Sequence, residues 1–141
     1  MKRQKGQSLV EFALVFPFFL LFILGLIYSG MLFYDYSTLS VIARSVARER
    51  AISQPYNATE KTGIKDETIQ DYYFDSNLKK FKPSLITGLY VPKTPEAISI
   101  YTVGDDIVVS VSVVLGERSP IMAIILPDQY SIVYHMRKEY K

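Results

Sequence analysis

The sequence predicts an α+β protein: a long N-terminal helix, membrane-spanning and then amphipathic, packed on a small antiparallel sheet, with a second short helix. Three observations lead to this fold class. An apolar run near the N-terminus has the length of a membrane span. A helical pattern of apolar residues continues beyond that run, and the last third of the chain alternates apolar with polar residues as half-buried strands do. Laying the amphipathic half of the helix across the sheet buries both apolar stripes.

The expected organisation has four parts. In chain order they are a basic leader (1–6), a transmembrane helix (7–34), an extracytoplasmic continuation of that helix (35–53) and a small α+β extracytoplasmic domain (54–141). Removing the anchor leaves about a hundred residues, which is enough to bury one small core. We therefore expect one anchored unit with one modest domain.

The membrane span is the first element. No charged residue occurs in the 23 residues from Phe12 to Tyr34. A helix of that length covers about 35 Å, more than the roughly 30 Å of a bilayer's hydrocarbon core. A cleaved secretory signal has a shorter apolar core of about 7–15 residues, which disfavours that interpretation. The basic leader residues Lys2, Arg3 and Lys5 favour a cytoplasmic N-terminus with the rest of the chain outside.

Pro17 lies inside the apolar run, where it removes one helical hydrogen bond and crowds the carbonyl of Ala13. Two interpretations stay open. One is a mild helix kink of the sort common in membrane helices. The other is a bend that helps copies of the chain to fit together. Further along, Gly25, Ser29 and Gly30 form a small-residue patch, and such patches let helices approach closely.

Beyond the span, the helix is expected to continue to about Ile52, since no glycine or proline interrupts residues 31–54. The apolar stripe of this outer half consists of Tyr36, Leu39, Ala43 and Val46. Residues 54–63 are expected to form a loop and residues 82–95 an irregular segment. Between them, residues 64–81 predict a second amphipathic helix with Ile69, Tyr72, Tyr73 and Leu78 turned inward.

The last third of the chain predicts strands. Residues 97–103 and 107–115 flank Gly104-Asp105, and a Gly-Asp pair between two alternating runs signals a hairpin. Residues 129–137 predict a third strand, with Tyr130, Ile132, Tyr134 and Met136 on one face. Before it, Ser119-Pro120 starts either a short helix or an apolar loop through Leu126.

The composition argues against several classes of function. The formal charge of +2 falls to −1 if the first six residues, with their three cations, are removed, so nucleic-acid binding has no electrostatic support. The absence of cysteine excludes disulfides, thiolate catalysis and cysteine-ligated metals. His135 is the only histidine, no nucleophile motif frames a serine, and Asp105-Asp106 is expected to be a solvated turn. We expect no catalytic residue, cofactor, metal or small-molecule substrate.

A single acid, Glu11, lies at the start of the uncharged run. Ionisable groups at membrane depth are costly and by default indicate a function with a partner. Cutting the chain after Gly6 would leave a cationic α-amino group on Gln7, which can pair with the carboxylate of a neighbouring copy. The arrangement predicts a subunit that is stored in a membrane, cleaved and packed into a filament. Taken singly, Gly6 also fits a flexible residue, and Glu11 an acid stabilised near a helix N-terminus.

Residues 6–17, GQSLVEFALVFP, resemble the opening of type IV pilins and pseudopilins, and more narrowly that of the TadE-like minor pilins. Ala43-Arg44 and Ala47-Arg48 resemble the continuation of that family. The resemblance implies a tight-adherence (Flp-type) pilus, or its secretion apparatus, in a bacterial cell membrane. It also implies cleavage of the Gly6–Gln7 bond by a prepilin peptidase and a role for Glu11 in processing or assembly. The partners that it implies are other pilin subunits and the membrane proteins of pilus assembly.

An alternative from another class shares the same anchor and domain. It is an unprocessed single-pass membrane protein with a small extracytoplasmic binding domain. Cleavage after Gly6, and loss of function when Glu11 is replaced, separate the two hypotheses. An enzyme is a third and less favoured class, because the family's chemistry makes this chain a substrate of the peptidase.

Overall fold

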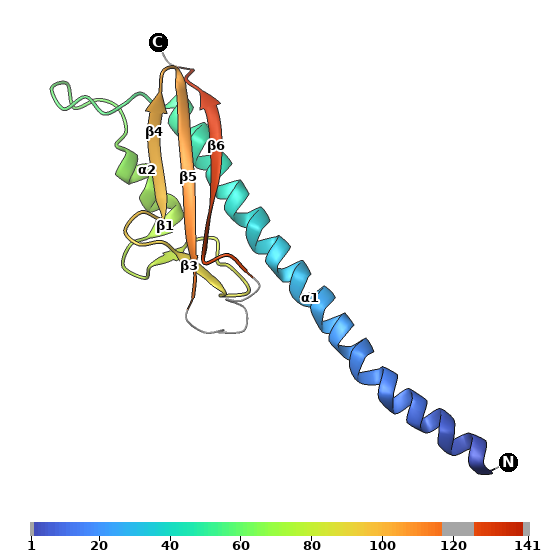
Figure 1. The fold of residues 1–141 in the computed structure, drawn as a ribbon. Helices are drawn as coiled ribbons and strands as arrows, with labels where there is room; N and C mark the ends of the chain where they lie inside the picture. The colour runs from blue at the N-terminus through green and yellow to red at the C-terminus, as the bar shows by residue number, and fades with distance from the viewer. Residues whose placement is uncertain (1, 117–125, 140–141) are drawn as a thin grey trace. The chain divides into compact units, whose positions relative to one another are not determined.

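The computed structural model describes residues 2–116 and 126–139, with side chains from Gln7 onward (Figure 1). Two helices are described, α1 (Lys2–Ile52) and α2 (Asp66–Tyr73). The strands in the described ranges are β1 (Phe74–Asp75), β2 (Lys80–Phe81), β3 (Tyr90–Pro92), β4 (Ile98–Val103), β5 (Asp106–Leu115) and β6 (Gln129–Arg137). The predicted α+β class is confirmed. The element expected to start at Ser119-Pro120 lies outside the described residues.

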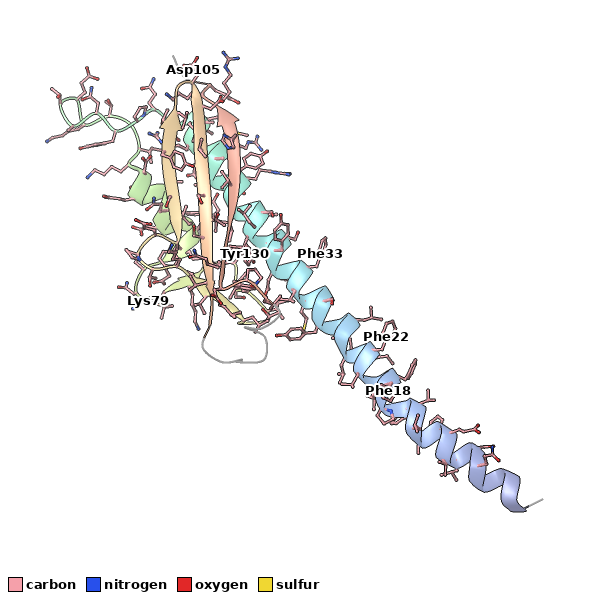
Figure 2. All side chains as sticks on the ribbon, viewed as in Figure 1. Phe18, Phe22, Phe33, Lys79, Asp105 and Tyr130 are labelled. Carbon is pink, nitrogen blue, oxygen red and sulfur yellow. The ribbon has the colours of Figure 1, made fainter. Side chains whose placement is uncertain are left out.

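The chain divides into two compact units, Met1–Tyr34 and Asp35–Lys141. The first unit is the N-terminal part of α1, and almost all of its large apolar side chains are exposed. Phe33, for example, is 73 % exposed, and Figure 2 shows Phe18 and Phe22 projecting away from the helix axis. A helix that is apolar on every side is stable only in apolar surroundings. The helix from Gln7 to Ile52 contains an 18-residue stretch of mean hydropathy 2.6, and its length and composition are sufficient to cross a bilayer. This helix fits a single-pass membrane protein.

The second unit is built around β5. Its first half pairs with β4 and its last residues with β3, while β6 pairs with both parts from the other edge, all antiparallel. Strands β4 and β5 meet in a two-residue turn, since Val103 lies opposite Asp106. Gly104 has φ +62° there, a left-handed conformation that glycine adopts at little cost. The predicted hairpin and the predicted third strand are both confirmed.

The core of the second unit lies between the sheet and residues 35–52 of α1, which cross one face of it (Figure 1). On β5, the alternating residues Ile107, Val109, Val111 and Val113 are at most 1 % exposed. They face the helix residues Leu39, Ala43, Val46 and Ala47, which are fully buried. Ala43 and Ala47 lie in this core beside the larger Leu39 and Val46. The amphipathic stripe predicted for this half of the helix is therefore confirmed at Leu39, Ala43 and Val46, whereas Tyr36 is 51 % exposed.

The end of β6 is tied back to the end of α1. The backbone nitrogen of Glu139 donates a hydrogen bond to the carbonyl of Ala51 at 3.0 Å. Halfway along the same strand, the Arg44 guanidinium lies 5.7 Å from the centre of the Tyr134 ring, a cation–π contact. The helix and β6 are thus joined by contacts along their length as well as by the apolar core.

The predicted second helix is too long. The helix α2 ends at Tyr73, and residues 74–81 form the hairpin of β1 and β2 instead. The carboxylate of Asp75 accepts hydrogen bonds from the backbone nitrogens of Asn77 (2.9 Å) and Leu78 (3.0 Å). Such side-chain bonds offer the backbone an alternative to the helix.

The hairpin also changes which side chains are buried. Phe74 and Phe81 pack edge to face, with ring centres 5.8 Å apart, and both are buried. Of the residues expected to point inward, Ile69 is buried, whereas Tyr72 and Leu78 are 67 % and 68 % exposed. Leu78 lies in the hairpin, where the helical periodicity no longer applies, whereas Tyr72 lies on an exposed side of α2 itself. In the segment expected to be irregular, residues 90–92 form β3.

Candidate processing and assembly site

The Gly6–Gln7 bond lies within α1. The backbone of Lys2, Arg3 and Lys5 is part of the same helix, and the side chains of these basic residues lie outside the described ones. Helix ends open at little cost in free energy because few packed contacts hold them. The N-terminal turns of α1 around this bond can therefore unwind at little cost.

Gln7 and Glu11 are the two predicted site residues that the structure brings together. The Gln7 side-chain nitrogen Nε2 donates a hydrogen bond to Oε1 of Glu11 at 3.3 Å. Residues four apart lie on the same side of a helix, one turn above the other, which explains the contact. Both side chains are exposed, and Glu11 is flanked by the exposed apolar residues Val10 and Phe12. The only acid of the first unit therefore borders a continuous apolar surface.

The surface of the first unit has room for another helix. A methyl group added at Gly25 or Gly30 would meet nothing within 4 Å. Neither glycine is thus required by packing within this single copy. Pro17 lies inside α1 without ending it. Near it, the rings of Phe12 and Phe16 stack with centres 5.4 Å apart. These features leave an uninterrupted apolar rod on which lipid or further helices can pack.

Sequence reasoning missed Asp35 as a structural residue of the second unit. Its side chain is only 2 % exposed, and its carboxylate accepts hydrogen bonds from the backbone nitrogens of Ile86 (2.7 Å) and Thr87 (3.0 Å). The Thr87 hydroxyl also donates to it. A buried carboxylate is tolerated when hydrogen-bond donors surround it in this way. Asp35 therefore fixes the segment around Thr87 to the helix. The available signal was its place as the first charged residue after the uncharged run.

A cluster of tyrosine rings lies close to Asp35. The ring of Tyr130 packs edge to face on Tyr90, with centres 4.6 Å apart, and lies 6.4 Å from the ring of Tyr36. The Tyr90 hydroxyl donates to the carbonyl of Pro127 at 3.1 Å. Burial, followed by the nearby Tyr90, Asp35 and Tyr36, raises the pKa of Tyr130 to about 12. Tyr130 therefore keeps its proton at physiological pH.

At the end of α1, Arg50 joins the helix to α2. Its Nε lies 2.6 Å from Oδ1 of Asp66, and its Nη1 donates to the carbonyl of Ser53 at 3.1 Å. Arg50 is buried, whereas the side chain of Asp66 is 43 % exposed. The contact with Asp66 is an ion pair without regular hydrogen-bond geometry at Oδ1. Both charges also interact favourably with the helix dipoles, because the Arg50 cation lies in the last turn of α1 and the Asp66 carboxylate in the first turn of α2.

The described residues hold no group of three or more histidine and acidic side chains that could bind a metal ion. At the turn between β4 and β5, Asp105 accepts a backbone hydrogen bond from Lys138 at 2.9 Å, and its carboxylate lies 4.0 Å from Arg137 with both side chains exposed. An open hollow of about 780 Å³ beside β2 and β3 is lined mainly by apolar residues and two lysines. None of its described lining residues is a histidine or an acid.

Comparison with known families assigns the N-terminal part of the chain. Residues 6–48 match the family model described as TadE-like protein. The match begins at Gly6, includes Gln7, Glu11 and Pro17, and ends at Arg48 on the buried half of α1. It covers less than a third of the chain and leaves the sheet outside. No curated protein and no solved structure matches the chain. The predicted resemblance to the TadE-like group is confirmed.

Proposed function

We propose that this chain, which is TadE-like over residues 6–48, is a minor pilin or pseudopilin of a tight-adherence pilus or a related secretion apparatus. In this proposal the chain is stored in the bacterial cell membrane with its N-terminus in the cytoplasm. A prepilin peptidase cuts the Gly6–Gln7 bond, and the second unit functions outside the cytoplasm. Its partners are the peptidase, other pilin subunits, pilus assembly proteins and membrane lipid.

The observation that carries the proposal is the start of the family match at Gly6, on a helix whose membrane-length apolar stretch is exposed. The same surface suits two environments. In the membrane it contacts lipid, and in a filament it contacts the apolar helices of neighbouring copies. Because both environments are apolar, moving from one to the other costs little of the hydrophobic free energy. The free-energy difference between the helix in the membrane and the helix in a filament then depends on its few polar groups.

Glu11 is the polar group on which this free-energy difference depends. Cleavage creates an α-amino group on Gln7, which is cationic over most of the physiological range. In a filament, that cation of one copy and the Glu11 carboxylate of a neighbour neutralise each other at apolar depth. An unpaired charge there costs about 2.5–3.5 kcal/mol on insertion scales, so pairing favours the assembled state. The chain acts in this chemistry as a substrate, and we propose no catalytic role for it.

The test is the intact mass of the protein from native membranes, combined with N-terminal sequencing. The expected start is Gln7, replaced by Met1 when the membrane peptidase is deleted. A Gly6→Leu variant should keep the Met1 start because the larger side chain obstructs the cut. Gly25→Leu makes the same change away from the cut, in open space, and should be processed normally. A Met1 start in cells with active peptidase contradicts the proposal and favours an unprocessed single-pass membrane protein.

A further inference from the structure

Gln7 is a helix residue in the uncleaved chain and becomes the N-terminal residue in the proposed cleaved chain. It follows the proposed cut, and its side-chain amide donates to Glu11 at 3.3 Å. The inference below rests on the proposed function, since it needs Gln7 to become the first residue. Gln7 is also exposed, so its α-amino group and amide are accessible once the leader is removed.

A glutamine at a chain start can react with itself. The lone pair of the α-amino nitrogen attacks Cδ of the side-chain amide and forms a new N–Cδ bond. The Cδ–Nε2 bond then breaks, and Nε2 leaves as ammonia with a proton taken from the attacking nitrogen. The product is a five-membered lactam, pyroglutamate. The reaction needs no oxidant, reductant or other reactant, and it replaces a cationic α-ammonium by a neutral amide.

We propose that Gln7 is a self-modification site whose cyclisation is held back by Glu11. The hydrogen bond to Oε1 draws the Gln7 amide along the helix toward residue 11. Cyclisation needs the opposite arrangement, with Cδ folded back onto the nitrogen of the same residue. A carboxylate one turn away also favours the protonated amine, which has no lone pair for the attack. Glu11 is therefore a positioning residue that keeps the new N-terminus linear and charged.

The state of Gln7 decides whether a copy can take part in charge pairing. A linear Gln7 presents the cation that the proposed filament contact requires. A cyclised Gln7 presents a neutral lactam, so the Glu11 carboxylate of a neighbour is left without a partner. Since the reaction is not reversed by water at neutral pH, each stored copy loses its ability to pair after a characteristic time. The Gln7–Glu11 contact sets that time.

The experiment measures the mass of the N-terminal peptide from protein held in native membranes, at intervals after synthesis stops. A cyclised peptide is lighter than the linear one by one ammonia. Glu11→Ala should cyclise faster than wild type by about twofold or more, the scale of one side-chain pair on a helix. Glu11→Gln, which keeps an acceptor without the charge, should fall between them. Gln7→Ser cannot form the lactam and gives the reference for a linear N-terminus.

Two further readouts separate this role from a general effect on the helix. The rate of cyclisation should rise with pH as the α-amino group of Gln7 loses its proton. The pH at the midpoint of this rise should be lower in Glu11→Ala than in wild type. Unfolding the cleaved wild-type protein in denaturant at the same pH removes the contact between Gln7 and Glu11 and should speed cyclisation. This measurement needs no variant, so it still tests the inference if a Glu11 variant is not processed. Equal rates in wild type, Glu11→Ala and unfolded protein overturn the inference and leave the proposed function standing. A Met1 start in every sample overturns both.

Discussion

The carboxylate of Asp35 lies 2.7 Å from the backbone nitrogen of Ile86, which donates a hydrogen bond to it across 51 residues of sequence. Asp35 is the first residue of the second unit and directly follows the uncharged run. Its three donors come from two consecutive residues, Ile86 and Thr87. One buried acid therefore holds an irregular segment against the helix that carries the core.

Replacing Asp35 by alanine should destabilise the second unit by about 3–6 kcal/mol, because hydrogen bonds to charged groups are worth roughly 1.5–3 kcal/mol each and two backbone donors lose their partner. Asp35→Asn keeps one acceptor oxygen and should cost less. The measurement is thermal unfolding of the full chain in detergent, followed by the near-ultraviolet circular dichroism of its tyrosines. Glu96→Ala removes an exposed acid and should change stability by less than about 0.5 kcal/mol. Equal unfolding of Asp35→Ala and wild type would contradict the anchoring role.

The Arg50–Asp66 pair predicts an asymmetry between its two partners. Asp66→Ala leaves the buried Arg50 cation without its counter-charge, whereas Arg50→Met leaves Asp66, whose side chain is 43 % exposed, in contact with water. Removing one partner of a buried pair costs about 3–5 kcal/mol when the other charge stays buried. Asp66→Ala should therefore lower stability more than Arg50→Met does. The same unfolding assay tests this order, and a larger loss in Arg50→Met would show that the packing of the arginine outweighs its charge.

The tyrosine cluster predicts alkaline destabilisation. The pKa of Tyr130 is raised to about 12, mainly by burial, from about 10 in an unfolded chain. Its contribution to stability is complete below pH 10 and is lost as the pH rises toward 12, because the unfolded state releases the proton first. Burial also raises the pKa of Tyr73 and Tyr90, which add to the same effect. Melting temperature should fall over this range, and less steeply in Tyr130→Phe. An equally steep fall in that variant would assign the effect to other groups.

Much of the fold follows from local sequence. The alternation of apolar and polar residues in β5 and β6, and the Gly104-Asp105 turn between β4 and β5, need only neighbours within a few residues. The end of α2 does not follow in this way, because Asp75 competes for the backbone through its own side chain. The apolar periodicity predicted a helix as far as residue 81. In the structure the helix ends at Tyr73, where the hydrogen bonds of the Asp75 side chain and the Phe74–Phe81 contact favour a hairpin instead.

The candidate site divides in the same manner. The Gln7–Glu11 contact follows from a spacing of four on a helix. The role of Asp35 does not, because its donors arrive only after the chain has folded back through the sheet. The partner expected for Glu11 belongs to another copy, so neither the sequence nor a single chain contains that contact. For this reason Glu11 is tested through assembly rather than through stability.

Replacing Glu11 by alanine should leave cleavage after Gly6 in place and lower filament yield at least roughly tenfold, since an unpaired charge at apolar depth costs about 2.5–3.5 kcal/mol. Glu11→Gln should show a similar loss, because it keeps the shape and removes the charge. Glu60→Ala removes an exposed acid of the second unit and should assemble as wild type does. Filaments are measured by immunoblotting of the sheared fraction and by electron microscopy, with the N-terminus of the membrane fraction sequenced in parallel. Normal filaments from the Glu11→Ala strain would refute the pairing of Glu11 with a neighbour's α-amino group, because no other acid lies in residues 7–34 to replace it.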